Sequence, residues 1–283
     1  MKAFYMTRIS LHIILIIILV SCSNSTNKKA VSDQEGIRIV SLAQSVSKEL
    51  EDLNMSDNIV GATSYCDISK TNKDLIIGTS TDVNIEKILL LKPDIVFATT
   101  LTKESTIFSL KNNGVKVHQI RKLESFEDIC NHFIKLGELV GKEDLARSIT
   151  NKSWQKIDSL KKIIPIHTEK QKVFFQIGAK PLFTVIPKTF MNDYITISGG
   201  ENIASDFNKG TITREAVLQR NPDVIFVVTM GILGDDEKKT WKSYKELKAA
   251  KNNKIFIINS DIACSPTVLS FTETLEQVIN YIY

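Results

Sequence analysis

Two stretches of the chain, NIEKILLLKPDIVFA (residues 84–98) and TREAVLQRNPDVIFV (residues 213–227), repeat one another at an offset of 129 positions. They share the pairs Glu86/Glu215, Leu89/Leu218, Pro93/Pro222, Asp94/Asp223 and Phe97/Phe226. In each copy a residue able to cap a helix precedes a short amphipathic run, and a proline then ends the run. An apolar run rich in β-branched residues follows. Each copy therefore predicts a helix, a tight turn and a buried parallel strand.

A second matched pair lies downstream of each copy. KNNGVKVHQI (residues 111–120) and KNNKIFIINS (residues 251–260) both read as the end of a helix, a turn and a strand. Further strands are predicted at RIVSLA (38–43), IVGATS (59–64) and KVFFQIG (172–178). Two such matches favour two similar lobes over a single sheet. The predicted fold class is α/β, with two Rossmann-like α/β lobes, one long connecting helix and a ligand cleft between the lobes.

The connecting helix is predicted from residues 141–164, which contain no proline and no internal glycine. Apolar residues at helical spacing continue up to Pro165, so the helix is expected to be roughly 35 Å long. The predicted boundaries are an N-terminal lobe at 37–140, the connecting helix at 141–165 and a C-terminal lobe at 166–283.

The N-terminus has the pattern of an export signal. Lys2 and Arg8 precede an apolar run over residues 9–20, which is short for a bilayer span. The run ends in LVSC (residues 19–22), which resembles a bacterial lipoprotein lipobox, with cleavage before Cys22 and a lipid on its sulfur. An ordinary secretory signal or a short anchor is the alternative. We expect a signal peptide at 1–21, a polar tether at 22–36, and a lipid-anchored protein of the cell envelope outside the cytoplasm.

Composition narrows the function classes. The 283 residues are 43% hydrophobic, which is enough for sizeable cores, and the formal net charge is +4. Basic and acidic residues are interspersed, so a nucleic-acid partner is not expected. After Cys22 three cysteines remain, an odd number that excludes a full disulfide framework. Cys130 lies at helical spacing among apolar residues and is predicted to be a small buried hydrophobe.

A family resemblance rests on four parts of the chain. These are the leader, the two repeat copies, the connecting helix, and the stretch RIVSLAQSVSKELEDLNMSDNIVGATSYCD (residues 38–67). The chain resembles the class III substrate-binding lipoproteins of ABC importers, the receptors for cobalamin, ferric siderophores and haem. The resemblance covers residues 38–283. It implies an extracytoplasmic receptor that captures a metal chelate and delivers it to a permease homodimer with its ATPase.

The resemblance also gives the repeated glutamates a role. In this family a surface glutamate on each lobe docks into arginine pockets of a two-fold symmetric permease, and Glu86 and Glu215 occupy those positions. A carrier that presents one acid on each lobe suits a homodimeric partner. The alternative is that both glutamates complement their helix dipoles, which typically contributes about 0.3–1 kcal/mol each.

Ligands of paired α/β lobes bind beyond the carboxyl ends of the strands. The predicted ligand-binding residues are Ser64, Tyr65, Cys66, Ser80, Thr99, Arg121, Asp261 and Cys264, with Ala43–Ser45, Thr79, Thr100, Lys122, Thr229, Met230 and the rest of the 261–266 loop around them. The resemblance matches Tyr65 to the tyrosine that packs on the corrin ring, and Asp261 to an acid at the floor of the cleft. The alternatives are an ordinary half-buried tyrosine and a turn-forming aspartate.

Several features depart from the cobalamin receptors. Gln44 replaces a frequent proline, Ser80 and Thr99 stand where tryptophans line the pocket, and Thr267 replaces an arginine. The only tryptophans are Trp154 in the connecting helix and Trp241, predicted on a surface helix. A hydroxyl-rich pocket with few aromatic residues is therefore expected.

A corrinoid is the favoured ligand. A ferric siderophore comes next, with Arg121 and Lys122 as partners for its negative charge or, equally, as solvated loop cations. Haem would need an axial tyrosine or histidine, for which Tyr65 could serve. Of the histidines only His118 is considered as a possible pocket residue, and no cluster predicts a bare metal site or a bound cofactor. Three alternatives remain open for Cys66 and Cys264: they form a disulfide bridge, they ligate a metal centre, or they are free thiols.

The two remaining function classes are enzymes and surface modules. The sequence contains no phosphate-binding loop, no GxSxG elbow and no HExxH pair, so no enzyme is predicted, although separated residues can converge in space. A surface adhesion or assembly module would not require a two-lobed cleft with matched acids, and it ranks last.

Overall fold

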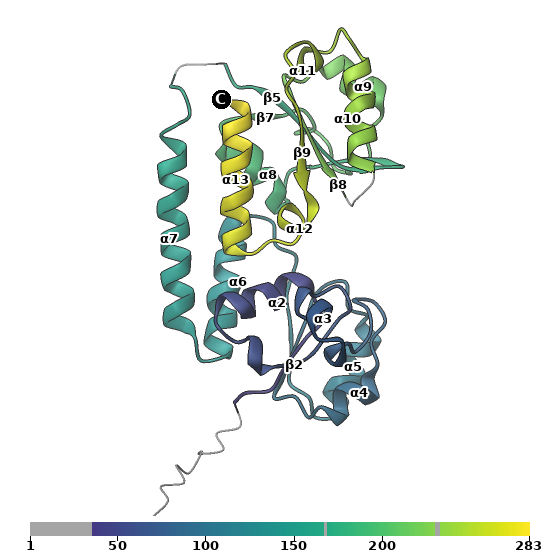
Figure 1. Ribbon diagram of the computed structural model, residues 1–283, viewed down its shortest axis with the longest axis vertical. Coiled ribbons are helices and arrows are strands. Elements are labelled where there is room, and N and C mark those ends of the chain that lie inside the picture. Colours follow the sequence, from purple (N-terminus) through teal and green to yellow (C-terminus); the bar gives the residue numbers. More distant parts are fainter. Residues whose placement is uncertain (1–35, 167–168, 230–232) are drawn as a thin grey trace, which may run out of the picture. The chain divides into compact units, whose positions relative to one another are not determined.

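The computed structural model describes residues 36–166, 169–229 and 233–283, which contain two sheets with helices packed around them (Figure 1). The predicted signal peptide, nearly all of the tether, and Cys22 lie outside the described residues. Within those residues, no helix is both long enough and apolar enough to cross a membrane.

The first sheet is wholly parallel and has the strand order β2–β1–β3–β4. Its strands are β1 (Ile39–Ser41), β2 (Ile59–Ala62), β3 (Ile95–Ala98) and β4 (Val117–Gln119). The connecting helices are α2 (Gln44–Asp52), α3 (Asp67–Thr71), α4 (Ile85–Leu90) and α5 (Glu104–Asn112), with 3-10 turns at Ser56–Asn58 and Lys73–Leu75. The strands predicted for this lobe are confirmed, with ends trimmed by up to two residues.

The second sheet has the order β6–β5–β8–β9, with β7 paired to β5. Its strands are β5 (Lys172–Ala179), β6 (Leu182–Thr184), β7 (Glu201–Asn202), β8 (Val224–Thr229) and β9 (Ile255–Asn259). Strands β5 and β6 form an antiparallel hairpin, and the other pairings are parallel. The helices of this lobe are α8 (Phe190–Ile197), α9 (Arg214–Arg220), α10 (Leu233–Ser243), α11 (Lys248–Lys251) and α12 (Ser260–Ala263).

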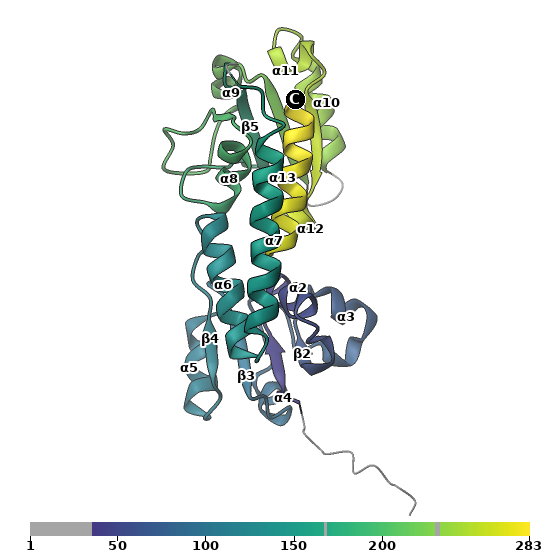
Figure 2. The ribbon, with the colours of Figure 1, turned by 90° about the vertical axis from the view of Figure 1, so that its left-hand side faces the viewer.

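A long helix, α7 (Glu143–Lys161), joins the two α/β lobes, and it packs along α6 (Phe126–Leu139) and α13 (Val268–Ile282) (Figure 2). It is shorter than predicted at both ends. Gly141 has a left-handed φ of 72°, which an α-helix does not accommodate. Gly137 allows α6 and α7 to approach closely, because a Cβ there would lie 2.6 Å from the Cβ of Ala146. The lobe boundaries at residues 140 and 165 stay a prediction.

The repeated stretches have the same structure in both lobes. Each helix stops at a left-handed residue directly before the shared proline, at Lys92 (φ 46°) and Asn221 (φ 45°). Asp94 accepts a hydrogen bond of 2.7 Å from the backbone N–H of Arg38, at the entry to β1. In the second lobe Asp223 accepts one of 2.9 Å from Lys172, at the entry to β5. The predicted order of helix, turn and strand is confirmed in both copies.

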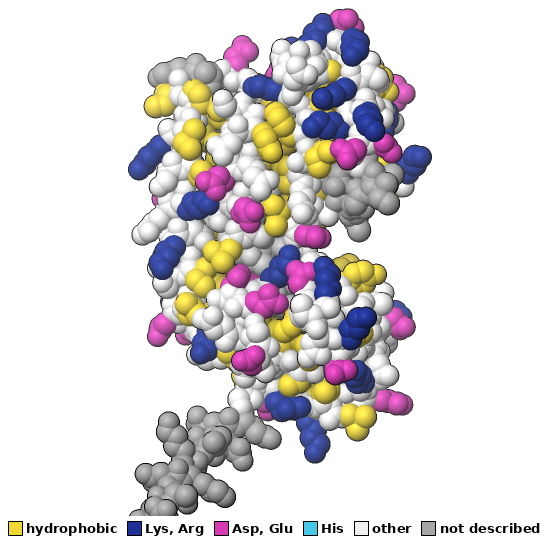
Figure 3. Space-filling model, in the orientation of Figure 1, with side chains coloured by type: hydrophobic (Ala, Val, Ile, Leu, Met, Phe, Trp, Pro, Cys, Tyr) yellow, Lys and Arg dark blue, Asp and Glu magenta, His cyan; other side chains and the backbone are white. Residues whose placement is uncertain are grey.

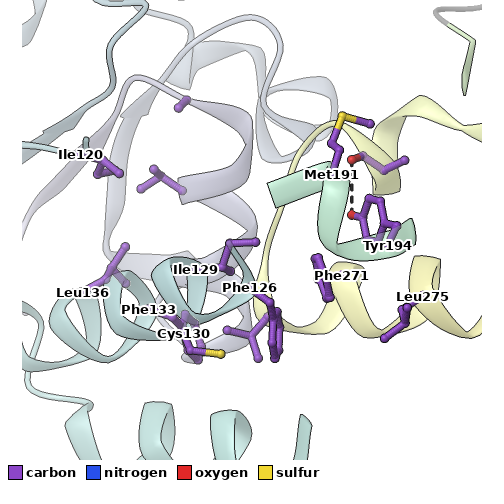
Figure 4. Packing of buried hydrophobic residues seen from close by; sticks show 14 of the residues in the cluster. Ile120, Phe126, Ile129, Cys130, Phe133, Leu136, Met191, Tyr194, Phe271 and Leu275 are labelled. Carbon is purple, nitrogen blue, oxygen red and sulfur yellow. Dashed lines mark hydrogen bonds between the residues drawn. The ribbon is translucent and has the colours of Figure 1, made fainter. Parts of the chain in front are cut away.

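One large apolar cluster includes residues from both lobes and from the three long helices. Phe126 of α6 stacks on Phe271 of α13 at a centroid distance of 4.4 Å, and Phe271 stacks in turn on Tyr194 of α8 (Figure 4). Cys130 is 3% exposed, so its prediction as a buried hydrophobe is confirmed.

Two smaller clusters cover the outer faces of the two sheets. Trp241 lies in the cluster of the second lobe and is fully buried. The prediction of a surface position for this tryptophan is therefore wrong, because α10 turns that face onto β5, where the Trp241 Nε1–H donates to Gln176 Oε1 at 2.6 Å.

Candidate ligand cavity

A cavity of about 700 Å³ opens between the loops that follow the strands of the two lobes. From the first lobe it is lined by Ala43–Ser45, Glu49, Tyr65, Ser80, Thr99–Leu101, Ile120–Leu123 and His132. From the second lobe it is lined by Ile177, Phe183–Ile186, Thr189–Met191, Gly210 and Cys264–Pro266. Its size lies within the range of about 300–1,000 Å³ that is usual for small-molecule sites. It lies beyond the carboxyl ends of parallel strands, as the α/β pattern predicts.

Five of the eight predicted ligand-binding residues line this cavity: Tyr65, Ser80, Thr99, Arg121 and Cys264. Tyr65 is 59% exposed, which leaves its side chain accessible to a ligand. Arg121 is exposed and makes no hydrogen bond or ion pair with a described residue. A cation of this kind can pair with a negative charge on a ligand without first breaking an internal bond.

The other three predicted residues do not line the cavity. Cys66 is fully buried, and its Sγ lies 3.3 Å from the Thr63 hydroxyl. Ser64 is exposed, and its backbone N–H donates to the carbonyl of Gly78. Asp261 lies in the first turn of the short helix α12, and its backbone carbonyl accepts a hydrogen bond from Lys48 of α2 at 3.0 Å. A role in ligand binding stays a prediction for these three.

Cys264 and Cys66 are free thiols in the structure. The pKa of Cys264 is raised to about 11 by desolvation of its sulfur and by the nearby Asp261 carboxylate, so this thiol remains protonated at neutral pH. Among the described residues, no group of three or more His, Cys, Asp or Glu side chains could hold a metal ion.

The second lobe contributes an apolar wall that sequence reasoning did not anticipate. Phe183 and Val185 come from the β5–β6 hairpin, and Phe190 and Met191 come from the start of α8. The hydroxyl-bearing residues Ser80, Thr99 and Thr100 come from the first lobe, as expected. Thr184, Thr189 and Ser265 add hydroxyl groups from the second lobe, and Leu101 and Ile120 add apolar surface from the first, so both lobes offer polar and apolar groups to a ligand.

A buried acid and a histidine also line the cavity, and neither was predicted to do so. Glu49 of α2 is 1% exposed, and its Oε2 lies 2.9 Å from Nε2 of His132 on α6, whose side chain is 8% exposed. Burial lowers the pKa of His132, but the Glu49 carboxylate outweighs it and leaves that pKa above its usual value. The expectation that only His118 might reach the pocket is wrong. Glu49 could have been found, since it lies three residues after Val46 on the apolar face of its helix.

His118 faces a second, more polar cavity of about 480 Å³, which shares Arg121, Lys122 and His132 with the first. Burial, followed by the positive charges nearby, lowers the pKa of His118. The His118 ring packs edge-on against Phe97 of β3. This histidine is thus held by core contacts beside the main cavity.

Three polar contacts bridge the lobes around the cavity. Lys48 donates to the Asp261 carbonyl at 3.0 Å, and Ser265 donates to Gln44 Oε1 at 3.3 Å. Lys122 donates to the carbonyl of Lys188 at 3.0 Å. These contacts are few and partly solvated, so a ligand that replaced them would lose little energy.

Glu86 and Glu215 lie in the first turns of α4 and α9 and are exposed. Asn84 and Thr213 cap these two helices through their side chains. Neither glutamate side chain makes a hydrogen bond or ion pair with any described residue. On the face of the molecule shown in Figure 3, basic and acidic side chains are intermixed.

A family model described as "Periplasmic binding protein" matches residues 39–262. The "Uncharacterized ABC transporter substrate-binding lipoprotein YvrC" of Bacillus subtilis (strain 168) is 26% identical over 269 residues, which is 92% of this chain and 85% of that protein. The "Vitamin B12-binding protein" of Vibrio parahaemolyticus is 25% identical over 245 residues, or 84% of this chain and 87% of its own.

Among solved structures, that of a possible iron-binding (periplasmic solute-binding) protein from Staphylococcus epidermidis has a TM-score of 0.73 and 26% identity. The match covers 87% of this chain and 98% of the chain in that structure. All three similar proteins are named as binding proteins rather than as enzymes.

Proposed function

The chain belongs to the periplasmic binding protein family, and we propose that it is the extracytoplasmic solute receptor of an ABC importer. In this proposal Cys22 carries the lipid anchor, the cavity captures a metal chelate, and Glu86 and Glu215 dock onto a permease homodimer. The similarity to a named ABC transporter substrate-binding lipoprotein over 92% of the chain supports the transport class.

The docking proposal rests on which of the residues shared by the two repeats have contacts inside the protein and which do not. The two phenylalanines are fully buried, and the two leucines pack against the apolar clusters. The prolines follow the left-handed turns, and both aspartates bind the entry of the first strand of their lobe. The fold thus uses every shared position except Glu86 and Glu215, whose side chains have no partner among the described residues.

A helix-dipole contribution does not account for this identity. It is worth about 0.3–1 kcal/mol and can be supplied by an acid at any position in the first turn. Two diverged copies that keep the acid at one matched position are better explained by an external partner that reads both. A two-fold symmetric partner with basic pockets has the required symmetry and charge.

The docking test is uptake by cells or vesicles that contain the permease, with ligand affinity measured separately. We expect the double variant Glu86→Gln/Glu215→Gln to lose about tenfold or more of its uptake while its ligand affinity is unchanged. Glu127→Gln is the matched control, because Glu127 is an exposed acid in the first turn of α6 and has the same dipole role. Equal uptake by the double variant and the control would contradict the proposal.

For the ligand we propose a corrinoid such as cobalamin. The relative named as a vitamin B12-binding protein supports this choice. The exposed ring of Tyr65 and the apolar wall around Phe183 would enclose a flat macrocycle between them. A ferric chelate, either a siderophore or haem, is the second candidate. Arg121 is a cation on the rim with no ion-pair partner among the described residues, and the similar Staphylococcus epidermidis structure is of a possible iron-binding protein.

The ligand test uses soluble protein that starts at Ser23, titrated with cobalamin, cobinamide, haemin and ferric siderophores. Saturable binding of corrinoids alone supports the first candidate, and binding of only iron chelates supports the second. Tyr65→Ala is expected to weaken corrinoid binding by about tenfold, because a stacked ring contributes about 0.5–1.5 kcal/mol beyond its buried area. Phe108→Ala removes an equally exposed aromatic ring outside the cavity and is expected to have no effect.

A further inference from the structure

The Glu49–His132 pair is a buried polar pair in the wall of the main cavity. Glu49 reaches the wall from α2, and His132 reaches it from α6, 83 positions later in the chain. Their side chains are 1% and 8% exposed. Only one of the two carboxylate oxygens is used, since Oε1 of Glu49 is buried and has no hydrogen-bond partner among the described residues.

Stability does not explain this pair. Removing a carboxylate from water costs several kcal/mol, and a buried ion pair often contributes no more than apolar residues of the same volume. The half-satisfied carboxylate makes the balance less favourable still, because an unpaired buried acceptor costs about 1–3 kcal/mol. Each residue stands next to a fully buried apolar residue of its own helix, Leu50 or Phe133, so aliphatic side chains at positions 49 and 132 would also fit the buried parts of these helices.

The geometry fixes which ring nitrogen remains available. An ionised carboxylate only accepts hydrogen bonds, so the proton on Nε2 of His132 is directed at Glu49. Nδ1 makes no hydrogen bond to any described residue. A carboxylate behind a histidine is the arrangement that orients metal-ligating imidazoles and increases their basicity, because it fixes the tautomer and leaves the other nitrogen with its lone pair.

We propose that His132, held by Glu49, ligates the metal ion at the centre of the bound chelate through Nδ1. This inference rests on the proposed function, and it narrows the ligand to a cobalt or iron complex with one exchangeable axial position. In the binding step the bond from the metal to an axial water breaks, and the bond from the metal to Nδ1 forms. The oxidation state of the metal does not change, the water leaves to solvent, and any proton on Nδ1 leaves with it. Glu49 is a positioning residue that does not touch the metal.

The experiment uses aquocobalamin and haemin as probes on the whole soluble chain that starts at Ser23. Equilibrium dialysis measures binding, and absorption spectra, with electron paramagnetic resonance for ferric haem, report the axial ligand. We expect at least one probe to exchange its axial water for nitrogen on binding. His132→Asn should abolish this signature, and Glu49→Gln should keep it with an affinity about 10–100 times lower. His118→Asn is the matched control and should resemble the wild type, since His118 does not line the main cavity.

The outcomes separate this inference from the function on which it rests. If a probe binds but its axial water is retained, or if the nitrogen signature persists in His132→Asn, the inference is wrong and the receptor function stands. If Tyr65→Phe rather than His132→Asn changes the spectrum, the metal ligand is the tyrosine and the inference is again wrong. If no chelate binds, both fail. Should His132→Asn fold poorly, His132→Ala with added imidazole replaces it, and return of the nitrogen signature on adding imidazole supports the inference.

Discussion

The ion pair between Glu237 and Arg214 allows a test of how strongly burial acts in this fold. Nη2 of Arg214 donates to both carboxylate oxygens of Glu237, at 2.9 and 2.7 Å, and Gln176 Nε2 donates to Oε2 at 2.9 Å. The Arg214 guanidinium lies 4.7 Å above the centroid of the buried Trp241 ring. The partners of Glu237 among the described residues are therefore hydrogen-bond donors, and its negative charge faces a partly buried cation.

Glu237→Gln keeps the shape but places an amide NH₂ against a donor and leaves Arg214 without its counter-charge. Breaking a fully buried pair costs about 3–5 kcal/mol, and breaking an exposed pair costs about 0.2–1 kcal/mol. The side chains of Arg214 and Glu237 are 27% and 11% exposed, so we expect a loss between these limits. A decrease of about 2–3 kcal/mol in the free energy of unfolding corresponds to a fall in Tm of roughly 5–10 °C for a chain of this size.

Urea and thermal denaturation of the chain from Ser23 would measure this change. Glu246→Gln is the matched control, because Glu246 is 94% exposed and pairs with Lys251 at 2.7 Å, so the same substitution should cost less than about 1 kcal/mol there. Similar losses in the two variants would refute the reasoning, because burial would then have no part in the strength of the pair.

Three further predictions concern stability and thiol chemistry. Burial and two neighbouring carboxylates on α2 raise the pKa of Asp52 to about 6, so its ionisation opposes folding at pH 7. After allowance for screening by solvent, Asp52→Asn should raise the free energy of unfolding by about 1–2 kcal/mol at pH 7 and by almost nothing at pH 4. Urea denaturation at both pH values measures this difference. Gly78→Ala should cost about 2–3 kcal/mol in thermal melts, because φ is 129° and the new Cβ would lie 2.4 Å from a backbone oxygen, whereas Gly114→Ala, at φ 80° in open space, should cost only about 1 kcal/mol. When native protein is treated with a thiol reagent, Cys264 should react slowly at neutral pH and faster as the pH is raised towards 11. Cys66 should react only after unfolding, and equal rates for the two thiols would contradict its burial.

The repeats were predictable because each is decided by neighbouring residues. A cap, an amphipathic turn, a proline and a β-branched run are local signals, and α4–β3 and α9–β8 both follow them. The long helix α7 was predicted for the same reason. Its ends were misplaced by two or three residues, since apolar periodicity does not show that the left-handed Gly141 stays outside the helix.

The cavity was only half predictable. Residues that directly follow strands of the first lobe, such as Tyr65, Thr99 and Arg121, are placed by the strand pattern. The pairing of Glu49 with His132 depends on how α2 and α6 pack, and no local pattern reports contacts across 83 positions. Trp241 shows the same limit, because it is buried by the packing of α10 on the second sheet, where it contacts Phe174, 67 positions away.

The surroundings of the two repeated glutamates have diverged. Before Glu86 stands Ile85, which packs against an apolar cluster, and before Glu215 stands Arg214, which belongs to the polar network with Glu237. If docking required the same local structure on both lobes, these neighbours would be under the same constraint as the acids. Only the exposed carboxylates match, so the proposed partner has to recognise charge and position and can ignore how each helix is anchored. Two identical basic pockets related by a two-fold axis meet that requirement, and turning the receptor by half a turn on such a partner gives the same complex.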